Sequence, residues 1–362
     1  MEGVWDPARQ MRLLVIGGTG FLGSHIVEVL KSRKVDYEQA IGVFDLVKPP
    51  VDEIIAGVEY FEGDIVDEKR LTDVLKNFLP DVVFHTASPV HGLSDSVYYL
   101  VNEQGTRSVI SCCRAAFVKN LVYTSSTGVV WTGADFAGVS EDQVPIPKKG
   151  YDAYHHTKAV GERLVLEQNG LRDMRVVVLR PCGMTGERDK QMIWRLASAL
   201  EKGQHNIQIG SENNLVDYAY VGNVAHAHVL AADRLLTAPD TVAGETFFIT
   251  NGSPIPQWDF QRLVFKELGD DGSKKIVVIP RWIMMIMAGI AEMWSKLTGC
   301  KVELTRFTVK FVTGVQWYNI DKARRFLQYE PQVSLEEGIR RTVSWWKRSG
   351  AAQHKQQEKK TV

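Results

Sequence analysis

A glycine-rich turn near the start of the chain constrains the fold more than any other feature. The apolar run 11–16 passes directly into Gly-Gly-Thr-Gly-Phe-Leu-Gly and then into a helical pattern of apolar residues. Gly17 would permit the tight turn, Gly20 would let backbone N–H groups approach a pyrophosphate, and Gly23 would let the helix pack closely on the strand. The alternative is a glycine-rich turn of an α/β protein without a ligand. The cofactor-binding candidates here are Gly17, Gly20, Phe21, Leu22 and Gly23.

A second apolar run, 41–45, ends in Asp45, about 20 residues beyond the glycines. A carboxylate at this place would accept hydrogen bonds from the adenosine ribose and repel a 2′-phosphate. The pattern therefore favours NAD as the cofactor. Lys48 and Arg33 are near enough in sequence to leave NADP open. An aspartate that only closes a strand-end turn is the alternative.

Apolar runs alternate with helical patterns through the first half of the chain. The runs 58–64, 81–87, 118–124 and 174–180 predict buried strands, with helices expected at 69–78, 97–116 and 152–168. This alternation predicts an α/β fold of the Rossmann type, a doubly wound parallel sheet. His85, on an apolar strand, is expected to be a core residue. The strand exits that would border the adenine and the dinucleotide are Asp64, Ile65, Thr86, Ala87 and Ser88.

Three side chains after the fifth strand predict the chemistry. Ser126 follows the strand, at the carboxyl end where doubly wound sheets bind ligands. Tyr154 and Lys158 are four residues apart on the next helix and so share a face. A phenol has a pKa of about 10, and a positive charge within ~4–6 Å favours its phenolate. We interpret Tyr154 as the catalytic base, Lys158 as the group that tunes it and contacts the cofactor, and Ser126 as a partner of the reacting oxygen. A surface Tyr/Lys pair and a plain turn serine are the alternatives.

The sixth strand leads into Pro181 and Gly183, which would wall the nicotinamide. After residue 185 the predicted elements become shorter. We predict an NAD-binding domain over 1–185, to which some later segments return, and a smaller α+β substrate-binding region over 186–349. Residues 350–362, rich in Lys, Gln and Glu, are expected to form a disordered tail.

Composition excludes several kinds of partner. The 43 basic and 43 acidic residues give a net charge of zero, so no overall field attracts nucleic acid. The four cysteines have no CxxC spacing, and His226 and His228 would diverge on a helix, so we expect no metal site. The first residues lack an apolar h-region, and we expect no secretory signal.

An apolar segment at 281–298 stands out in the second half of the chain. It carries Trp282 and Trp294, with Arg281 before it and Lys296 near its end. As a helix it would be about 25 Å long, whereas a spanning helix needs ~20 apolar residues, and Glu292 interrupts the run. The pattern is typical of a helix lying in one leaflet, with tryptophans at the headgroups. A buried core helix is the alternative.

Together, the glycine turn, Asp45, Ser126 and the Tyr154–Lys158 pair resemble the extended short-chain dehydrogenase/reductase family over residues 11–345. Within that family the chain is most similar to the 3β-hydroxysteroid dehydrogenase branch, in the segments 122–126, 179–189, 214–228 and 249–256. The segment 282–294 falls where this branch has its membrane-associated region. The resemblance implies NAD-dependent oxidation of the 3β-hydroxyl of a 4α-carboxysterol, with loss of the C4 carboxylate as CO2, in sterol biosynthesis.

The same resemblance implies a location on the cytosolic face of the endoplasmic reticulum membrane, with peripheral or monotopic contact. It also allows a homodimer and a complex with other enzymes of sterol C4 demethylation. Three activities stay open as alternatives: a 3β-hydroxysteroid dehydrogenase with Δ5–Δ4 isomerase activity, a ketone reductase of secondary metabolism, and an epimerase of nucleotide sugars. A regulatory protein that senses NAD would share the glycine turn but would not need the serine, tyrosine and lysine together.

Overall fold

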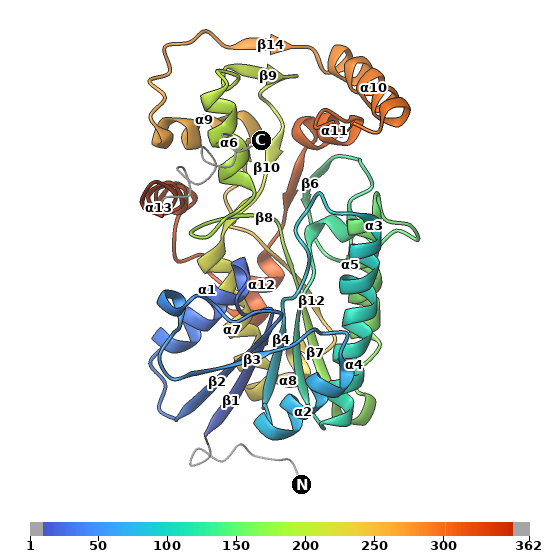
Figure 1. The fold of residues 1–362 in the computed structure, drawn as a ribbon, viewed down its shortest axis with the longest axis vertical. Coiled ribbons are helices and arrows are strands. Elements are labelled where there is room, and N and C mark those ends of the chain that lie inside the picture. The colour runs from blue at the N-terminus through green and yellow to red at the C-terminus, as the bar shows by residue number, and fades with distance from the viewer. Residues whose placement is uncertain (1–9, 301, 350–362) are drawn as a thin grey trace.

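The computed structural model describes residues 10–300 and 302–349, so the predicted tail at 350–362 lies outside the described residues. A seven-stranded parallel sheet occupies the half of the molecule that contains the N-terminus (Figure 1). Its strands are rich in Val, Leu and Ile because both faces are covered by helices. In spatial order they are β12 (Thr246–Ile249), β7 (Arg175–Pro181), β5 (Asn120–Thr124), β4 (Val82–His85), β1 (Met11–Ile16), β2 (Gln39–Asp45) and β3 (Val58–Glu62). The predicted doubly wound parallel sheet is confirmed.

Helices cover both faces of this sheet (Figure 1). One layer consists of α1 (Phe21–Ser32), α7 (Val221–Thr237), α8 (Pro239–Val242) and α12 (Asp321–Leu327). The other consists of α2 (Glu68–Phe78), α4 (Thr106–Ala115) and α5 (Ala153–Leu166). Strand β12 and helices α7 and α12 come from beyond residue 185. The later part of the chain therefore completes the half of the molecule that contains the seven-stranded sheet.

The helix predicted over 97–116 is confirmed as a helical segment over 95–115, but it is not α-helical throughout. It consists of α3 (Asp95–Tyr98), a π-helical segment, Tyr99–Gly105, and α4. At the end of the π-helical segment, a Cβ on Gly105 would lie only 2.4 Å from Ile65 Cδ1. The wider turn therefore ends at a glycine against which the exit of β3 packs, and π-helical turns of this kind often occur at functional sites.

The opposite half of the molecule contains small sheets and helices (Figure 1). A four-stranded sheet has the order β13 (Ile255–Pro256), β10 (Leu215–Val216), β15 (Gln316–Tyr318) and β6 (Phe136–Val139). Two strand pairs accompany it, β11 (Tyr218–Tyr220) with β8 (Gly183–Thr185), and β14 (Val277–Ile279) with β9 (Ile207–Ile209). The helices are α6 (Met192–Glu201), α9 (Gln257–Leu268), α10 (Arg281–Thr298), α11 (Arg306–Thr313) and α13 (Leu335–Arg348). Short 3₁₀ turns occupy Val51–Glu53, Thr127–Val130 and Leu171–Asp173.

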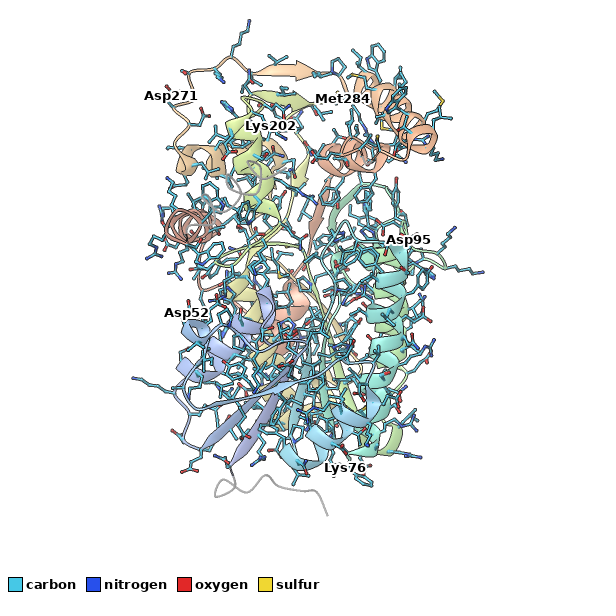
Figure 2. All side chains as sticks on the ribbon, in the orientation of Figure 1. Asp52, Lys76, Asp95, Lys202, Asp271 and Met284 are labelled. Atoms are coloured by element: carbon cyan, nitrogen blue, oxygen red, sulfur yellow. The ribbon has the colours of Figure 1, made fainter. Side chains whose placement is uncertain are left out.

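Helix α10 is not a core helix, so that alternative is wrong. Only Met284 and Ala288 are buried, and they face α11 and its neighbours. Met284 lies at the end of the molecule remote from Lys76 of α2 (Figure 2). Within the described residues no helix is both long enough and apolar enough to cross a membrane. The helix therefore presents an apolar outer face, formed by Trp282, Ile286, Met287, Ile290, Met293, Trp294 and Leu297.

Candidate active site

The candidate site lies at the carboxyl ends of the central strands. The strand order reverses between β1 and β4, which is where doubly wound sheets open a crevice for ligands. The turn after β1 requires glycine at its first position. Gly17 has φ +84°, and a Cβ there would lie 2.7 Å from the backbone nitrogen of Ala87. The hydroxyl of Thr86 donates to the carbonyl of Ile16 at 2.9 Å, so the exits of β1 and β4 lie side by side.

Close packing of α1 follows from Gly23, because a Cβ there would lie 2.1 Å from the Gly17 carbonyl oxygen. Gly20 is the N-cap of α1 and no side chain caps the helix, so its first N–H groups face outward beside the turn. Phe21 is partly buried and Leu22 is buried in the core below. The first turn of α1 carries no acidic residue. This cradle fits the pyrophosphate of a dinucleotide.

Asp45 ends β2 beside the glycine turn. One of its carboxylate oxygens accepts hydrogen bonds from the backbone N–H of Thr19 at 2.9 Å and from the Thr19 hydroxyl at 2.6 Å. Arg33 points elsewhere, since its guanidinium binds Asp233 of α7 at 2.9 and 3.1 Å. Of the two positive charges expected near Asp45, that of Arg33 is thus engaged by another carboxylate.

The other predicted contacts line the same edge of the sheet. Asp64 follows β3 and accepts a hydrogen bond from the Val66 N–H at 3.1 Å. Ile65 is 7% exposed. The hydroxyl of Ser88 donates to the side-chain oxygen of Asn102 at 2.9 Å. Asn102 is buried and donates in turn to the Thr157 hydroxyl at 3.1 Å, which ties the exit of β4 to α5.

Ser126, Tyr154 and Lys158 converge where β5 ends. Helix α5 begins after Asp152, whose carboxylate caps it by accepting from the His155 N–H at 2.8 Å. One turn on, the Lys158 ammonium donates to the Thr124 carbonyl at 2.5 Å and is 3% exposed. The Ser126 hydroxyl accepts from the Gly128 N–H at 3.1 Å and hydrogen-bonds the Tyr154 phenol. The structure therefore brings together the three predicted catalytic side chains.

The electrostatics of this group differ from the sequence-based expectation. Burial raises the pKa of the Tyr154 phenol to about 12, although the hydrogen bond from Ser126 acts in the opposite direction. Burial also lowers the pKa of the Lys158 ammonium to about 7, while the charge of Glu162 raises it. The protein groups alone therefore do not make the phenol acidic. Lys158 instead has a pKa near neutrality and can hold or release a proton there.

A buried polar layer lies beneath these residues. Glu162 accepts two hydrogen bonds from Arg180 at 3.1 Å and one at 2.5 Å, and it also accepts from the Ser125 hydroxyl at 2.5 Å. His85 is a buried core residue, as predicted, with one ring nitrogen 3.1 Å from the Thr106 hydroxyl. Burial lowers the pKa of His85 to about 3, so this ring is neutral.

Sequence reasoning missed the aromatic groups that surround the phenol. The ring of His91 packs on Tyr154 with centroids 3.8 Å apart, and the ring of Tyr98 packs edge-on at 5.6 Å. His155, to which no role was assigned, lies against the Tyr154 ring and binds Asp152 at 2.6 Å. A motif search finds catalytic pairs by spacing on one helix, whereas His91 comes from a loop and Tyr98 from α3.

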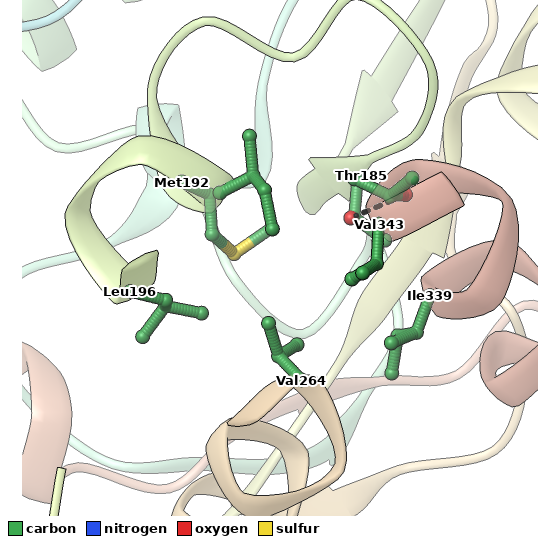
Figure 3. Close-up of a pocket in the computed structure, with 8 residues that line it drawn as sticks. Thr185, Met192, Leu196, Val264, Ile339 and Val343 are labelled. Carbon is green, nitrogen blue, oxygen red and sulfur yellow. Dashed lines mark hydrogen bonds between the residues drawn. The ribbon is translucent and has the colours of Figure 1, made fainter. Parts of the chain in front are cut away.

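The exit of β7 lies next to the exit of β5, with which it pairs. Pro181 ends the strand and Gly183 begins β8, where a Cβ on Gly183 would lie 3.1 Å from the Tyr218 ring. Figure 3 shows a different, largely apolar hollow between α6, α9 and α13. The hydroxyls of Thr185 and Thr342 pair there at 3.1 Å. None of the candidate catalytic residues lines this hollow, which belongs to the core of the second region.

The fold and the Ser–Tyr–Lys group define a Rossmann-fold dehydrogenase/reductase. The chain belongs to the 3-beta hydroxysteroid dehydrogenase/isomerase family, whose model matches residues 14–281. It is 40% identical over 337 residues to the decarboxylating sterol-4-alpha-carboxylate 3-dehydrogenase of Schizosaccharomyces pombe, covering 92% of this chain and 97% of that one. The human protein of the same name is 34% identical over 338 residues, covering 92% and 87%.

Solved structures share the fold at lower identity. A UDP-glucose 4-epimerase of Thermus thermophilus in complex with NAD has a TM-score of 0.69 and 23% identity, covering 94% of this chain and 100% of that one. A dTDP-glucose 4,6-dehydratase of Bacillus anthracis in complex with NAD has a TM-score of 0.69 and 18% identity, covering 94% and 98%. These likenesses support the doubly wound architecture.

Proposed function

We propose that this protein oxidises the 3β-hydroxyl of a 4α-carboxysterol to the 3-ketone with NAD, and that the C4 carboxylate then leaves as CO2. The observation that carries this proposal is the convergence of Ser126, Tyr154 and Lys158 beside the glycine turn. The similarity of the chain over 92% of its length to proteins named for this reaction identifies the alcohol.

In the oxidation step, Tyr154 takes the proton of the 3β-hydroxyl, while Ser126 holds the same oxygen. When bound, NAD accepts the C3 hydride and places a positive charge near the phenol. Lys158 holds or releases a proton near pH 7 because burial lowers its pKa to about 7. It can therefore pass the proton from the phenol onward and donate to the nicotinamide ribose.

The product of this oxidation is a β-keto acid, because the new carbonyl is at C3 and the carboxylate is attached to the neighbouring carbon, C4. The bond between C4 and the carboxyl carbon breaks, its electron pair forms the C3–C4 enolate, and a proton then adds to C4. The ketone draws the electrons, so this step needs no oxidant beyond the NAD already used. The overall products are a 3-ketone one carbon shorter, CO2 and NADH.

The direct test supplies a 4-carboxysterol with NAD and identifies the product by mass. A 3-keto product one carbon shorter is expected, whereas release of an unchanged carboxylated ketone would refute the decarboxylation. Tyr154→Phe should abolish turnover while NAD still binds, and retained turnover would refute the role of the phenol. A Δ5 steroid separates the isomerase alternative, and NADP as the only effective cofactor would contradict the role of Asp45.

We also propose that the outer face of α10 inserts into one leaflet of the endoplasmic reticulum membrane. Trp282 and Trp294, 65% and 61% exposed, lie near the two ends of the helix, where tryptophans favour the headgroup level. Flotation of the protein with neutral phosphatidylcholine vesicles tests this. Replacing Ile286 and Ile290 by Asp should abolish flotation, whereas the same change at exposed Leu171, outside α10, should not. The homodimer and the complex with other enzymes stay predictions from resemblance.

A further inference from the structure

His91 is an exposed residue whose ring contacts the ring of the catalytic phenol. Its ring packs on Tyr154 with centroids 3.8 Å apart and an interplanar angle of 47°. The residue as a whole is nevertheless exposed. Among the described residues none forms a hydrogen bond with its ring nitrogens. The proposed oxidation gives this imidazole no role.

The position of His91 is fixed by a tyrosine from α3. The hydroxyl of Tyr98 accepts from the N–H groups of Gly92 and Leu93 at 2.9 and 3.1 Å and donates to the Val90 carbonyl at 3.1 Å. Gly92 has φ +95°, a conformation that favours glycine. Because Tyr98 is buried and also packs on Tyr154, it holds the loop and the phenol in one arrangement. The backbone on both sides of His91 is therefore held beside the Tyr154 ring.

A positively charged residue of α6, in the half of the molecule with the small sheets, acts on His91. Arg195 of α6 is exposed, and its charge is one of the groups that lower the pKa of His91, after desolvation of the packed ring and the His155 ring. Asp152 acts in the opposite direction, and the pKa of His91 is about 4. The Arg195 side chain forms no ion pair or hydrogen bond with another described residue. The ring is thus a neutral hydrogen-bond donor within electrostatic reach of the Arg195 guanidinium, which also acts on the Asp189 carboxylate.

The other polar groups near the phenol are engaged. His155 has its Nδ1 bound to Asp152 at 2.6 Å, and its ring is buried against Trp131 and Phe307. Lys158 lies below the phenol and donates to a backbone carbonyl. Among the groups that act on His91, the Arg195 guanidinium is the positive charge and the Asp152 carboxylate, bound to His155, is the negative one.

We propose that His91 and Arg195 together bind the C4 carboxylate of the substrate. The inference rests on the proposed function, in which the 3β-oxygen sits at Tyr154. The carboxylate is attached to the carbon next to C3, so it must lie beside the phenol, on the side where the imidazole packs. A hydrogen bond from His91 and the charge of Arg195 would fix the carboxylate while the alcohol is oxidised. They would thus discriminate carboxylated sterols from sterols that lack the group.

The test compares kcat/KM for a 4α-carboxysterol and for the same 3β-hydroxysterol without the carboxylate. His91→Phe keeps the ring packing and removes the donor, and Arg195→Met removes the charge. Each should lower kcat/KM for the carboxylated sterol by about tenfold to a hundredfold, as expected for a lost charge-assisted hydrogen bond. Each should leave kcat/KM for the sterol without the carboxylate within about twofold, because that sterol forms no such hydrogen bond. Arg195→Lys should restore part of the loss.

Lys202→Met, at the end of the same helix as Arg195, is the matched control and should change neither value. Equal losses on both sterols would overturn the inference, since the ring would then only position Tyr154. Unchanged values for both sterols would overturn it as well. If the unaltered protein oxidised only the sterol without the carboxylate, the proposed function itself would fail, and that result is distinguishable because it requires no variant.

Discussion

Burial of Lys158 should make the protein less stable at neutral pH than it would be without this charge. The ammonium is 3% exposed and its pKa is lowered from 10.5 to about 7. In the unfolded chain the same group keeps its ordinary pKa, so between about pH 7 and 10.5 the unfolded state binds the extra proton. Stability from this group therefore rises with pH through that window. Below pH 7 the full cost applies, roughly 5 kcal/mol at about 1.4 kcal/mol for each pKa unit.

Lys158→Met removes this cost and keeps much of the side-chain volume. It also leaves the Thr124 carbonyl without its donor, which costs about 1–3 kcal/mol. We expect the variant to be about 2–4 kcal/mol more stable than the unaltered protein at pH 6.5 and catalytically inactive. From pH 6.5 to pH 9 the advantage should shrink by about 2.5 kcal/mol, because the unaltered protein recovers stability and the variant does not.

Urea unfolding of both proteins at pH 6.5 and pH 9 measures these differences. Lys76→Met is the matched control, since Lys76 is exposed on α2 and its replacement should change stability equally at both pH values. A free-energy difference between Lys158→Met and the unaltered protein that is the same at both pH values would refute the lowered pKa. A variant that is less stable at pH 6.5 would show that the hydrogen bond outweighs the burial cost.

Three further changes test the rest of the site. Glu162→Gln should lower the free energy of unfolding by about 3–5 kcal/mol, because it leaves the Arg180 charge buried without its partner. Chemical denaturation would measure this loss of stability. Gly23→Ala should abolish NAD binding, because the added Cβ would lie 2.1 Å from a backbone oxygen, and fluorescence titration would measure this. The control variant Gly289→Ala, which has open space around the added Cβ, should bind NAD normally. Asp45→Ala should raise kcat/KM for NADP relative to NAD by about tenfold or more, because it removes a carboxylate beside the turn that holds the ribose.

The sequence predicted best what depends on local spacing. The sheet, the glycine turn and the helix that carries Tyr154 and Lys158 follow from periodicity and from residue types needed at fixed offsets. The helix at 97–116 was predicted as one element because its apolar periodicity continues across the π-helical segment, at whose end Gly105 packs against Ile65. Sequence periodicity does not register such a contact.

What the sequence could not predict depends on contacts between distant segments. His91 is in a loop without periodicity, and its place over Tyr154 depends on the three backbone hydrogen bonds of Tyr98. Similarly, Arg33 was expected to influence the cofactor, but its partner Asp233 is 200 residues further on. The direction in which the Tyr154 pKa shifts was predicted wrongly. The sequence shows a positive charge one helical turn away, but it does not show that the phenol is buried.

The polar groups under the site differ in how their charges are balanced. Glu162 and Arg180 are buried as a hydrogen-bonded ion pair, so each compensates the other. Among the described residues Lys158 donates to a backbone carbonyl and lies over the Tyr123 ring at 4.7 Å, and the Glu162 charge, already paired, raises its pKa only in part. The ammonium is thus the one member of this group whose burial is uncompensated by a dedicated carboxylate. A second carboxylate beside Lys158 would stabilise the fold and raise its pKa back toward 10.5, and the residue would then no longer exchange a proton near pH 7.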